Sequence, residues 1–156
     1  MDVRYINPFV VAAANAFKVM AGWDAARGAP VVRGSFYNQA DLSGIIDLAG
    51  RARGVVLLSL PGRLAKDVFE KMTGLIAEEG DPGIPDAVGE LANVIVGGAK
   101  AGLTELGLDF QLSVPTVLSG KGQVMASPDG APCLIIPFQV DGDTLWLQFA
   151  LTALPE

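Results

Sequence analysis

The sequence predicts an α+β domain, a layered fold in which a mostly antiparallel sheet of about five or six strands is covered by three helices, two of them long. Three observations lead to this prediction. Segments with the apolar period of a helix are followed by shorter apolar runs typical of strands. Tight turns join several of those runs, which implies antiparallel pairing. The length of 156 residues suits one domain over residues 1–156, and no long linker divides the chain.

The first half of the chain is expected to contain one long helix and then strands. Asn7 and Pro8 predict a helix start, because Asn is a frequent N-cap and Pro suits the first helical position. The helix covers residues 9–21 and ends at Gly22. Short strands are predicted at residues 31–37 and 41–48. A turn at residues 50–54 then leads into the unbroken apolar strand 54–60, which Pro61 ends.

The second half is expected to contain two helices and the remaining strands. An amphipathic helix is predicted over residues 62–73, followed by an acidic loop and the long helix 85–106, which ends at Gly107. Residues 119–132 are predicted to be a loop of Gly, Ser and Pro. The remaining predicted strands cover residues 109–114, 133–140 and 144–151, with a tight turn between the last two.

The composition excludes several classes of function. The chain has no histidine, so it lacks a Ser-His-Asp or Cys-His apparatus and the commonest transition-metal ligand. Its single cysteine, Cys133, lies in an apolar run and is expected to be a small buried hydrophobe. A net charge of −6 disfavours binding to nucleic acid or to anionic lipid. Without a signal sequence or an apolar run of about 20 residues, the chain is expected to be cytoplasmic and not membrane-bound.

Three weaker motifs have ordinary structural explanations. Gly120-Lys121-Gly122 lacks the spacing and the Ser or Thr of a phosphate loop. The acidic run around Glu79 lacks the spaced oxygens of a calcium loop, so no metal site is predicted. The small residues from Gly98 to Gly102 indicate close packing of the long helix against a neighbour.

A line of polar and small residues follows one side of the long helix. Such a line is usually a solvated face, but this one contains residues that disfavour a helix. Asn93 lies mid-helix although Asn prefers caps, and glycines at 89, 97 and 98 each cost about 1 kcal/mol relative to Ala. These unfavourable choices indicate that the line has a function. At 3.6 residues per turn the outer face of the helix consists of Asp86, Glu90, Asn93, Gly97, Lys100 and Thr104, and the functional candidate is the part from Asp86 to Lys100.

Residues 89–100, with the sequence GELANVIVGGAK, resemble the signature helix of the CheC/CheX/FliY family of chemotaxis phosphatases. The opening MDVRYINPF is similar to CheX N-termini, and Pro115-Thr116-Val117 followed by Gly120 resembles the segment after the family's long helix. Order and spacing agree over nearly the whole chain. The single short domain resembles CheX more than CheC. The first helix has Ala12 three residues before Asn15, so it lacks the second Glu-x-x-Asn that CheC-like relatives carry.

The resemblance implies a phosphatase that hydrolyses the aspartyl-phosphate of a CheY-type response regulator. By position, Asn93 would orient the attacking water and Glu90 would contact the regulator's invariant lysine. Asp86, Gly89, Gly97 and Lys100 are the expected partner contacts. The Mg²⁺ ion would belong to the regulator, and the chain itself would need no cofactor. CheX proteins are generally homodimers, so a homodimer is implied. One departure is Gly98, where relatives often have Asn.

Two other functions remain open from the sequence. The same fold would also serve as a non-catalytic docking or scaffold module for two-component signalling proteins. A small-molecule hydrolase is a weaker alternative, because no nucleophile or general base supports it. The sequence does not identify the regulator or the signalling pathway.

Overall fold

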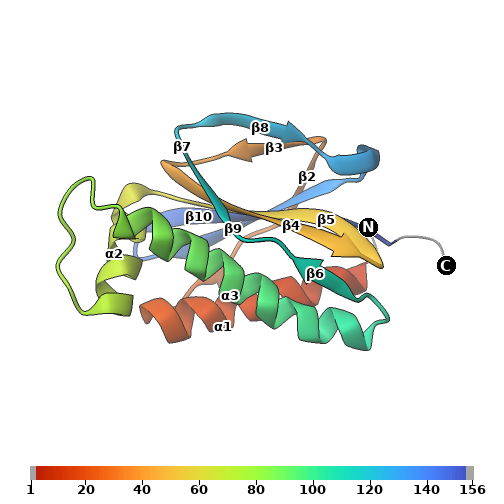
Figure 1. The fold of residues 1–156 in the computed structure, drawn as a ribbon, viewed down its shortest axis with the longest axis horizontal. Helices are drawn as coiled ribbons and strands as arrows, with labels where there is room; N and C mark the ends of the chain where they lie inside the picture. Colours follow the sequence, from red (N-terminus) through yellow and green to blue (C-terminus); the bar gives the residue numbers. More distant parts are fainter. Residues whose placement is uncertain (1–2, 154–156) are drawn as a thin grey trace.

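A large antiparallel sheet forms the middle layer of the protein, with helices on one face and a small second sheet on the other (Figure 1). The computed structural model describes residues 3–153. The large sheet has eight strands in the order β1-β9-β10-β5-β4-β6, with β2 also paired to β9 and β7 to β4. Strands β3 and β8 form the second sheet. The predicted α+β layered fold is therefore confirmed.

The strand bounds explain why the sheet is larger than the five or six strands predicted. Several strands have only two to four residues, too few to show an alternating pattern. In chain order the strands are β1 (Ala26–Arg27), β2 (Val31–Arg33), β3 (Ser35–Asn38), β4 (Leu42–Gly50), β5 (Ala52–Leu60), β6 (Phe110–Leu112), β7 (Thr116–Ser119), β8 (Gly122–Ala126), β9 (Cys133–Val140) and β10 (Asp143–Ala153).

Two strand predictions are wrong in detail. Residues 31–37 do not form one strand, because the chain leaves β2 at Gly34 and enters the second sheet as β3. Residues 119–132 are not only a loop, since they contain β8 and the short 3₁₀ turn η2 (Pro128–Gly130). The glycines at 120 and 122, before and at the start of β8, hid the strand, because Gly is depleted in strands.

The three predicted helices are confirmed, with shifted starts for two of them. Helix α1 (Ile6–Ala21) follows the 3₁₀ turn η1 (Val3–Tyr5), so Asn7 lies inside the first turn and is not the cap. Pro8 is tolerated there because the first-turn N–H groups have no intrahelical acceptor. Helix α1 ends, as predicted, at Gly22, whose φ of 69° is left-handed.

Helices α2 (Gly62–Thr73) and α3 (Gly83–Glu105) cover the same face of the sheet as α1. Helix α3 begins two residues before the predicted start at Pro85. The carboxylate of Asp81 accepts a hydrogen bond of 2.8 Å from the Gly83 N–H, which supplies an acceptor for one of the first-turn donors. Asp81 of the acidic loop therefore stabilises the first turn of α3.

The main core lies between the helices and the large sheet. Strand β10 sends Leu145, Leu147 and Phe149 toward the helices, as its alternation predicts. Phe9 of α1 stacks on Phe149 with ring centroids 4.4 Å apart. Strand β5 is buried on both faces, because Leu58 contributes to this core and Val55 and Leu57 contribute to a second one. This two-sided burial explains why residues 54–58 of the strand are all apolar.

The second core and a buried polar network join the small sheet to the large one. Phe36 of β3 packs against apolar residues of β5 and β9. The buried Gln148 amide accepts a 3.1 Å hydrogen bond from the Tyr37 N–H and donates one of 2.6 Å to the Tyr37 carbonyl. Ser43 donates to the Asn38 side chain at 2.6 Å. Satisfied networks of this kind fix one arrangement of the two sheets.

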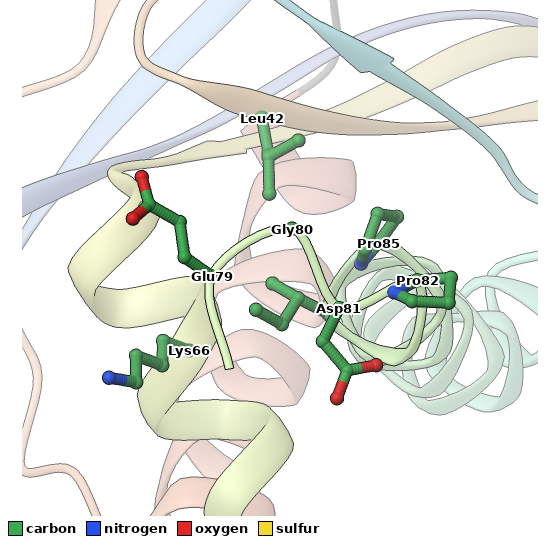
Figure 2. A pocket seen from close by; sticks show the side chains of 9 residues that line it. Leu42, Lys66, Glu79, Gly80, Asp81, Pro82 and Pro85 are labelled. Atoms are coloured by element: carbon green, nitrogen blue, oxygen red, sulfur yellow. The ribbon is translucent and has the colours of Figure 1, made fainter. Parts of the chain in front are cut away.

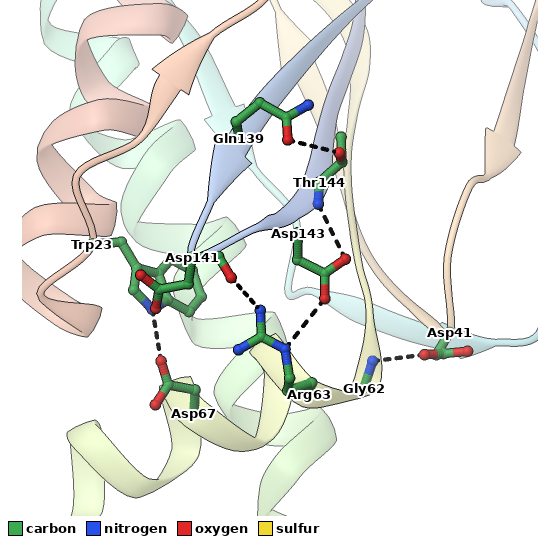
Figure 3. Close-up of polar contacts among 9 residues, drawn as sticks. All are labelled: Trp23, Asp41, Gly62, Arg63, Asp67, Gln139, Asp141, Asp143 and Thr144. Atoms are coloured by element: carbon green, nitrogen blue, oxygen red, sulfur yellow. Dashed lines mark hydrogen bonds and ion pairs between the residues drawn. The ribbon is translucent and has the colours of Figure 1, made fainter.

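Polar contacts also hold α2, which leads into the loop before α3 (Figure 3). The indole N–H of Trp23 donates to Asp67 of α2 at 2.7 Å. Arg63 forms an ion pair of 3.3 Å with Asp143 beside the turn between β9 and β10. Asp41 accepts from the Gly62 N–H at 2.7 Å, where the dipole of α2 favours a carboxylate. These contacts connect α2 to α1 and to the sheet.

Candidate functional site

Helix α3 buries one side in the main core and leaves the predicted polar line on the outside. The buried side consists of apolar residues at helical spacing: Val88, Leu91, Ala92, Ile95, Ala99 and Leu103. The opposite side is exposed at Asp86, Glu90, Gly97 and Thr104 and half-buried at Asn93 and Lys100. The orientation of α3 predicted from the sequence is therefore correct.

Glu90 is exposed and Asn93 is half-buried, and they lie one helical turn apart on the same face. Within residues 3–153, neither side chain forms a hydrogen bond or an ion pair. The carboxylate of Glu90 is free to accept hydrogen bonds from a cation. The carboxamide of Asn93 has both a donor and an acceptor available. The pair can thus bind a lysine ammonium and a water molecule side by side.

The other predicted contact residues divide into two groups. Asp86 and Gly97 are exposed on the same line as Glu90, and Lys100 is half-buried with its ammonium 6.0 Å from the ring centroid of Phe110. Gly89 differs, because it is buried and a Cβ there would lie 3.3 Å from Pro115. Packing within the chain accounts for the small size of Gly89, so Gly89 is not among the proposed partner contacts.

One flank of the line is formed by α1. The two helices approach closely where Gly98 faces Ala12, since a Cβ at Gly98 would be 3.2 Å from the Ala12 Cβ. A groove of about 530 Å³ runs along this contact and includes Val11, Asn15 and Val94 among its lining residues. The contact explains the departure at Gly98, because a side chain as large as Asn would force α1 away.

The other flank is formed by the connection between β6 and β7. Pro115 contacts α3 at Gly89, and Phe110 approaches it at Lys100. The residues between them, 111–114, therefore pass beside the part of α3 that carries Asn93. Val114 in this connection is strongly exposed. This exposure was not expected from the sequence, because Val114 continues the alternation of apolar and polar residues in the predicted strand 109–114.

A second hollow, of about 510 Å³, lies between α2, the acidic loop and the start of α3 (Figure 2). The charged residues that line this hollow are Lys66, Glu79 and Asp81. Figure 2 shows the two carboxylates pointing in different directions. The Asp81 carboxylate also accepts the hydrogen bond from the Gly83 N–H. Among the described residues, no three His, Cys, Asp or Glu side chains are grouped to hold a metal ion.

Cys133 is fully buried in the second core, as its apolar neighbours predict. Burial raises the pKa of the thiol from 9.0 to about 12. A thiol with so high a pKa has a negligible thiolate fraction near neutral pH and is a poor nucleophile. The Cys133 side chain lies on the far side of the sheet from α3 and takes no part in the candidate site.

The fold is that of a CheC-like domain, and comparisons with known proteins agree. Residues 42–139 match the family model described as chemotaxis phosphatase CheX. The chain therefore belongs to the CheX family of chemotaxis phosphatases. Among curated proteins, no sequence matches at a significant level. None of the helices within residues 3–153 is long and apolar enough to cross a membrane.

Solved structures show the same fold. A CheC-like superfamily protein from Shewanella sp. PV-4 is 31% identical, with 98% of this chain and 100% of that chain covered and a TM-score of 0.86. CheX from Desulfovibrio desulfuricans is 29% identical, with 95% and 99% covered and a TM-score of 0.85. A chain of the CheX-CheY-BeF3-Mg²⁺ complex from Borrelia burgdorferi is 23% identical, with 94% and 97% covered and a TM-score of 0.76. Of the segment MDVRYINPF, Met1 and Asp2 lie outside the described residues.

Proposed function

We propose that the chain accelerates hydrolysis of the aspartyl-phosphate of a CheY-type response regulator. The observation that carries this proposal is the presentation of Glu90 and Asn93 on one accessible face of α3, without any partner among the described residues. Membership of the CheX family supports phosphatase activity. The complex of a Borrelia burgdorferi protein of this fold with CheY, BeF3 and Mg²⁺ supports a receiver domain as the partner.

In the proposed reaction, Asn93 holds a water molecule in line with the acyl phosphate. The water oxygen attacks phosphorus, the bond between phosphorus and the aspartyl oxygen breaks, and the aspartate leaves as a carboxylate. The proton lost by the water ends on the released phosphate. Such a transfer needs mainly positioning and charge stabilisation, which suits a chain without histidine. A neutral amide adds no further negative charge beside the phosphoryl group.

Glu90 is assigned to recognition in this proposal. Its exposed carboxylate pairs with the lysine ammonium of the regulator's active site and so fixes the position of Asn93. The Mg²⁺ ion is supplied by the regulator. We also propose that the chain works in the cytoplasm as a homodimer, and light scattering in solution tests the oligomeric state.

The test is a time course with a panel of ³²P-phosphorylated receiver domains. The proposal predicts that substoichiometric chain removes the label from at least one receiver domain faster than it is lost spontaneously. Thr104→Ala, on the same line but three turns from Asn93, should leave the rate unchanged. Stable complexes that keep their label on every receiver domain would instead identify a docking module and contradict a phosphatase.

A further inference from the structure

Gly97 is a glycine in the middle of α3 that the packing of the fold does not require. A Cβ built at Gly97 would meet no atom within 4 Å. The glycines at 98 and 102 in the same helix differ, because Cβ atoms there would lie 3.2 Å from Ala12 and from Pro8. Gly97 also has no left-handed φ that would favour glycine. Glycine weakens a helix interior relative to alanine, so its presence here needs another reason.

Three exposed valines, from α1, from α3 and from the connection between β6 and β7, lie along the two sides of the polar line on α3. Val11 on α1 is 59% exposed, Val94 on α3 is 38% exposed, and Val114 between β6 and β7 is 85% exposed. Val11 and Val94 line the same groove beside Gly98. Val114 passes on the other side of α3, between the contacts that Pro115 and Phe110 make with the helix. The polar line thus has an apolar flank on each side.

We propose that Val11, Val94 and Val114 form an apolar rim that receives the phosphorylated receiver domain, with Gly97 as the point of closest approach. This inference rests on the proposed function. A protein that brings an acyl phosphate to Asn93 must cover the neighbouring surface of α3. It therefore removes the valines from water, and this burial supplies affinity. The partner is a receiver domain whose phosphorylation site is surrounded by apolar side chains.

The rim and the catalytic pair make different kinetic predictions. The rim acts in the ground state and in the transition state alike, so its loss raises KM and leaves kcat unchanged. Asn93 acts on the attacking water, so its loss lowers kcat. Gly97 keeps space open for the partner, and a larger side chain there hinders docking while the chain itself remains folded.

The experiment measures KM and kcat for phosphorylated receiver domain with the double variant Val11→Ser/Val114→Ser. The matched control is Val32→Ser, because Val32 is 60% exposed but lies on β2, at the opposite edge of the large sheet from β6 and β7. We expect KM to rise by roughly threefold to tenfold for the double variant and to be unchanged for the control. An unchanged KM for the double variant, or an equal rise in KM for Val32→Ser, would show that Val11 and Val114 do not receive the receiver domain.

A second comparison tests Gly97. Gly97→Gln is expected to raise KM by about tenfold or more while the melting temperature does not fall, because open space surrounds the position. Thr104→Gln adds a similar side chain to an exposed position further along the same line and should leave KM unchanged. Wild-type KM for Gly97→Gln would contradict the close approach of the receiver domain at this position.

The rim and the proposed function can fail separately. If Asn93→Ala is inactive while all rim variants keep wild-type KM, the proposed rim is wrong and the proposed phosphatase activity is retained. Full activity of Asn93→Ala removes the phosphatase mechanism itself.

Discussion

At the scale of residues, the spacing of Glu90 and Asn93 was sufficient to place them on one face of α3. Their accessibility also followed from the sequence, because the apolar residues of α3 mark the opposite side. The burial of Gly89 did not follow, since it depends on where Pro115 lies after a change of chain direction. The exposure of Val114 was not predicted either, because Val114 continues the alternating pattern of the predicted strand 109–114, whereas β6 ends at Leu112. Local spacing thus predicts a shared helix face but not what other segments cover.

Glu90→Ala is expected to weaken complex formation with the phosphorylated receiver domain by roughly fivefold to twentyfold, since one charge-assisted contact with the regulator's lysine is lost. Titration of fluorescent receiver domain at low and high salt measures the dissociation constants. The wild-type affinity should fall with added salt more steeply than that of the variant. Equal affinities for the two chains would show that the lysine contact is wrongly assigned.

Cys133 is expected to resist alkylation in the native chain at pH 8, because burial raises its pKa to about 12. The raised value favours the protonated thiol in the folded state. The corresponding contribution to stability is present below pH 9 and is lost as the pH rises toward 12. Mass spectrometry after iodoacetamide treatment should show labelling only when denaturant is added. Native labelling as fast as that of a free cysteine would contradict this prediction.

At the scale of elements, helices were predicted better than strands. Helix α2 has the predicted bounds because its amphipathic period and its closing glycine are both local signals. Strand β8 was missed because its sequence has no clear alternation, and its pairing with β3 joins residues far apart in the chain. The contact of α1 with α3 was indicated by the small residues near Gly98, but the identity of the neighbouring helix was not.

Gly98→Leu is expected to destabilise the protein by about 1–3 kcal/mol, because the larger side chain is forced against Ala12 of α1. Gly97→Leu is the matched control, and it should not destabilise the fold, since its position is open. Urea unfolding followed by circular dichroism measures both variants. Equal stabilities for the two would mean that α1 and α3 do not approach at Gly98 as described.

At the scale of the whole molecule, the layer of helices and the small second sheet lie on opposite faces of the large sheet (Figure 1). The sequence predicted one sheet covered by helices and did not show the second sheet. Gln148 connects the two sheets through both backbone groups of Tyr37. A polar residue inside a strand of alternating pattern has no visible partner in the sequence, so this connection was not predictable.

Gln148→Leu is expected to reduce the free energy of unfolding by about 1–3 kcal/mol, since two partly buried backbone groups of Tyr37 lose their hydrogen bonds. Hydrogen exchange should become faster in β3 and β8, while phosphatase activity at 25 °C is retained because α3 lies on the other face. Unchanged exchange in β3 would show that Gln148 does not hold the second sheet.

The proposed role of Asn93 is tested most directly by the dephosphorylation rate of Asn93→Ala at saturating phosphorylated receiver domain. We expect a fall of about 100-fold or more, toward the rate of spontaneous hydrolysis, because nothing then orients the attacking water. Binding and thermal stability should change little, since Asn93 has no partner among the described residues. Hydrolysis at the wild-type rate by a folded Asn93→Ala protein would show that Asn93 does not position the attacking water.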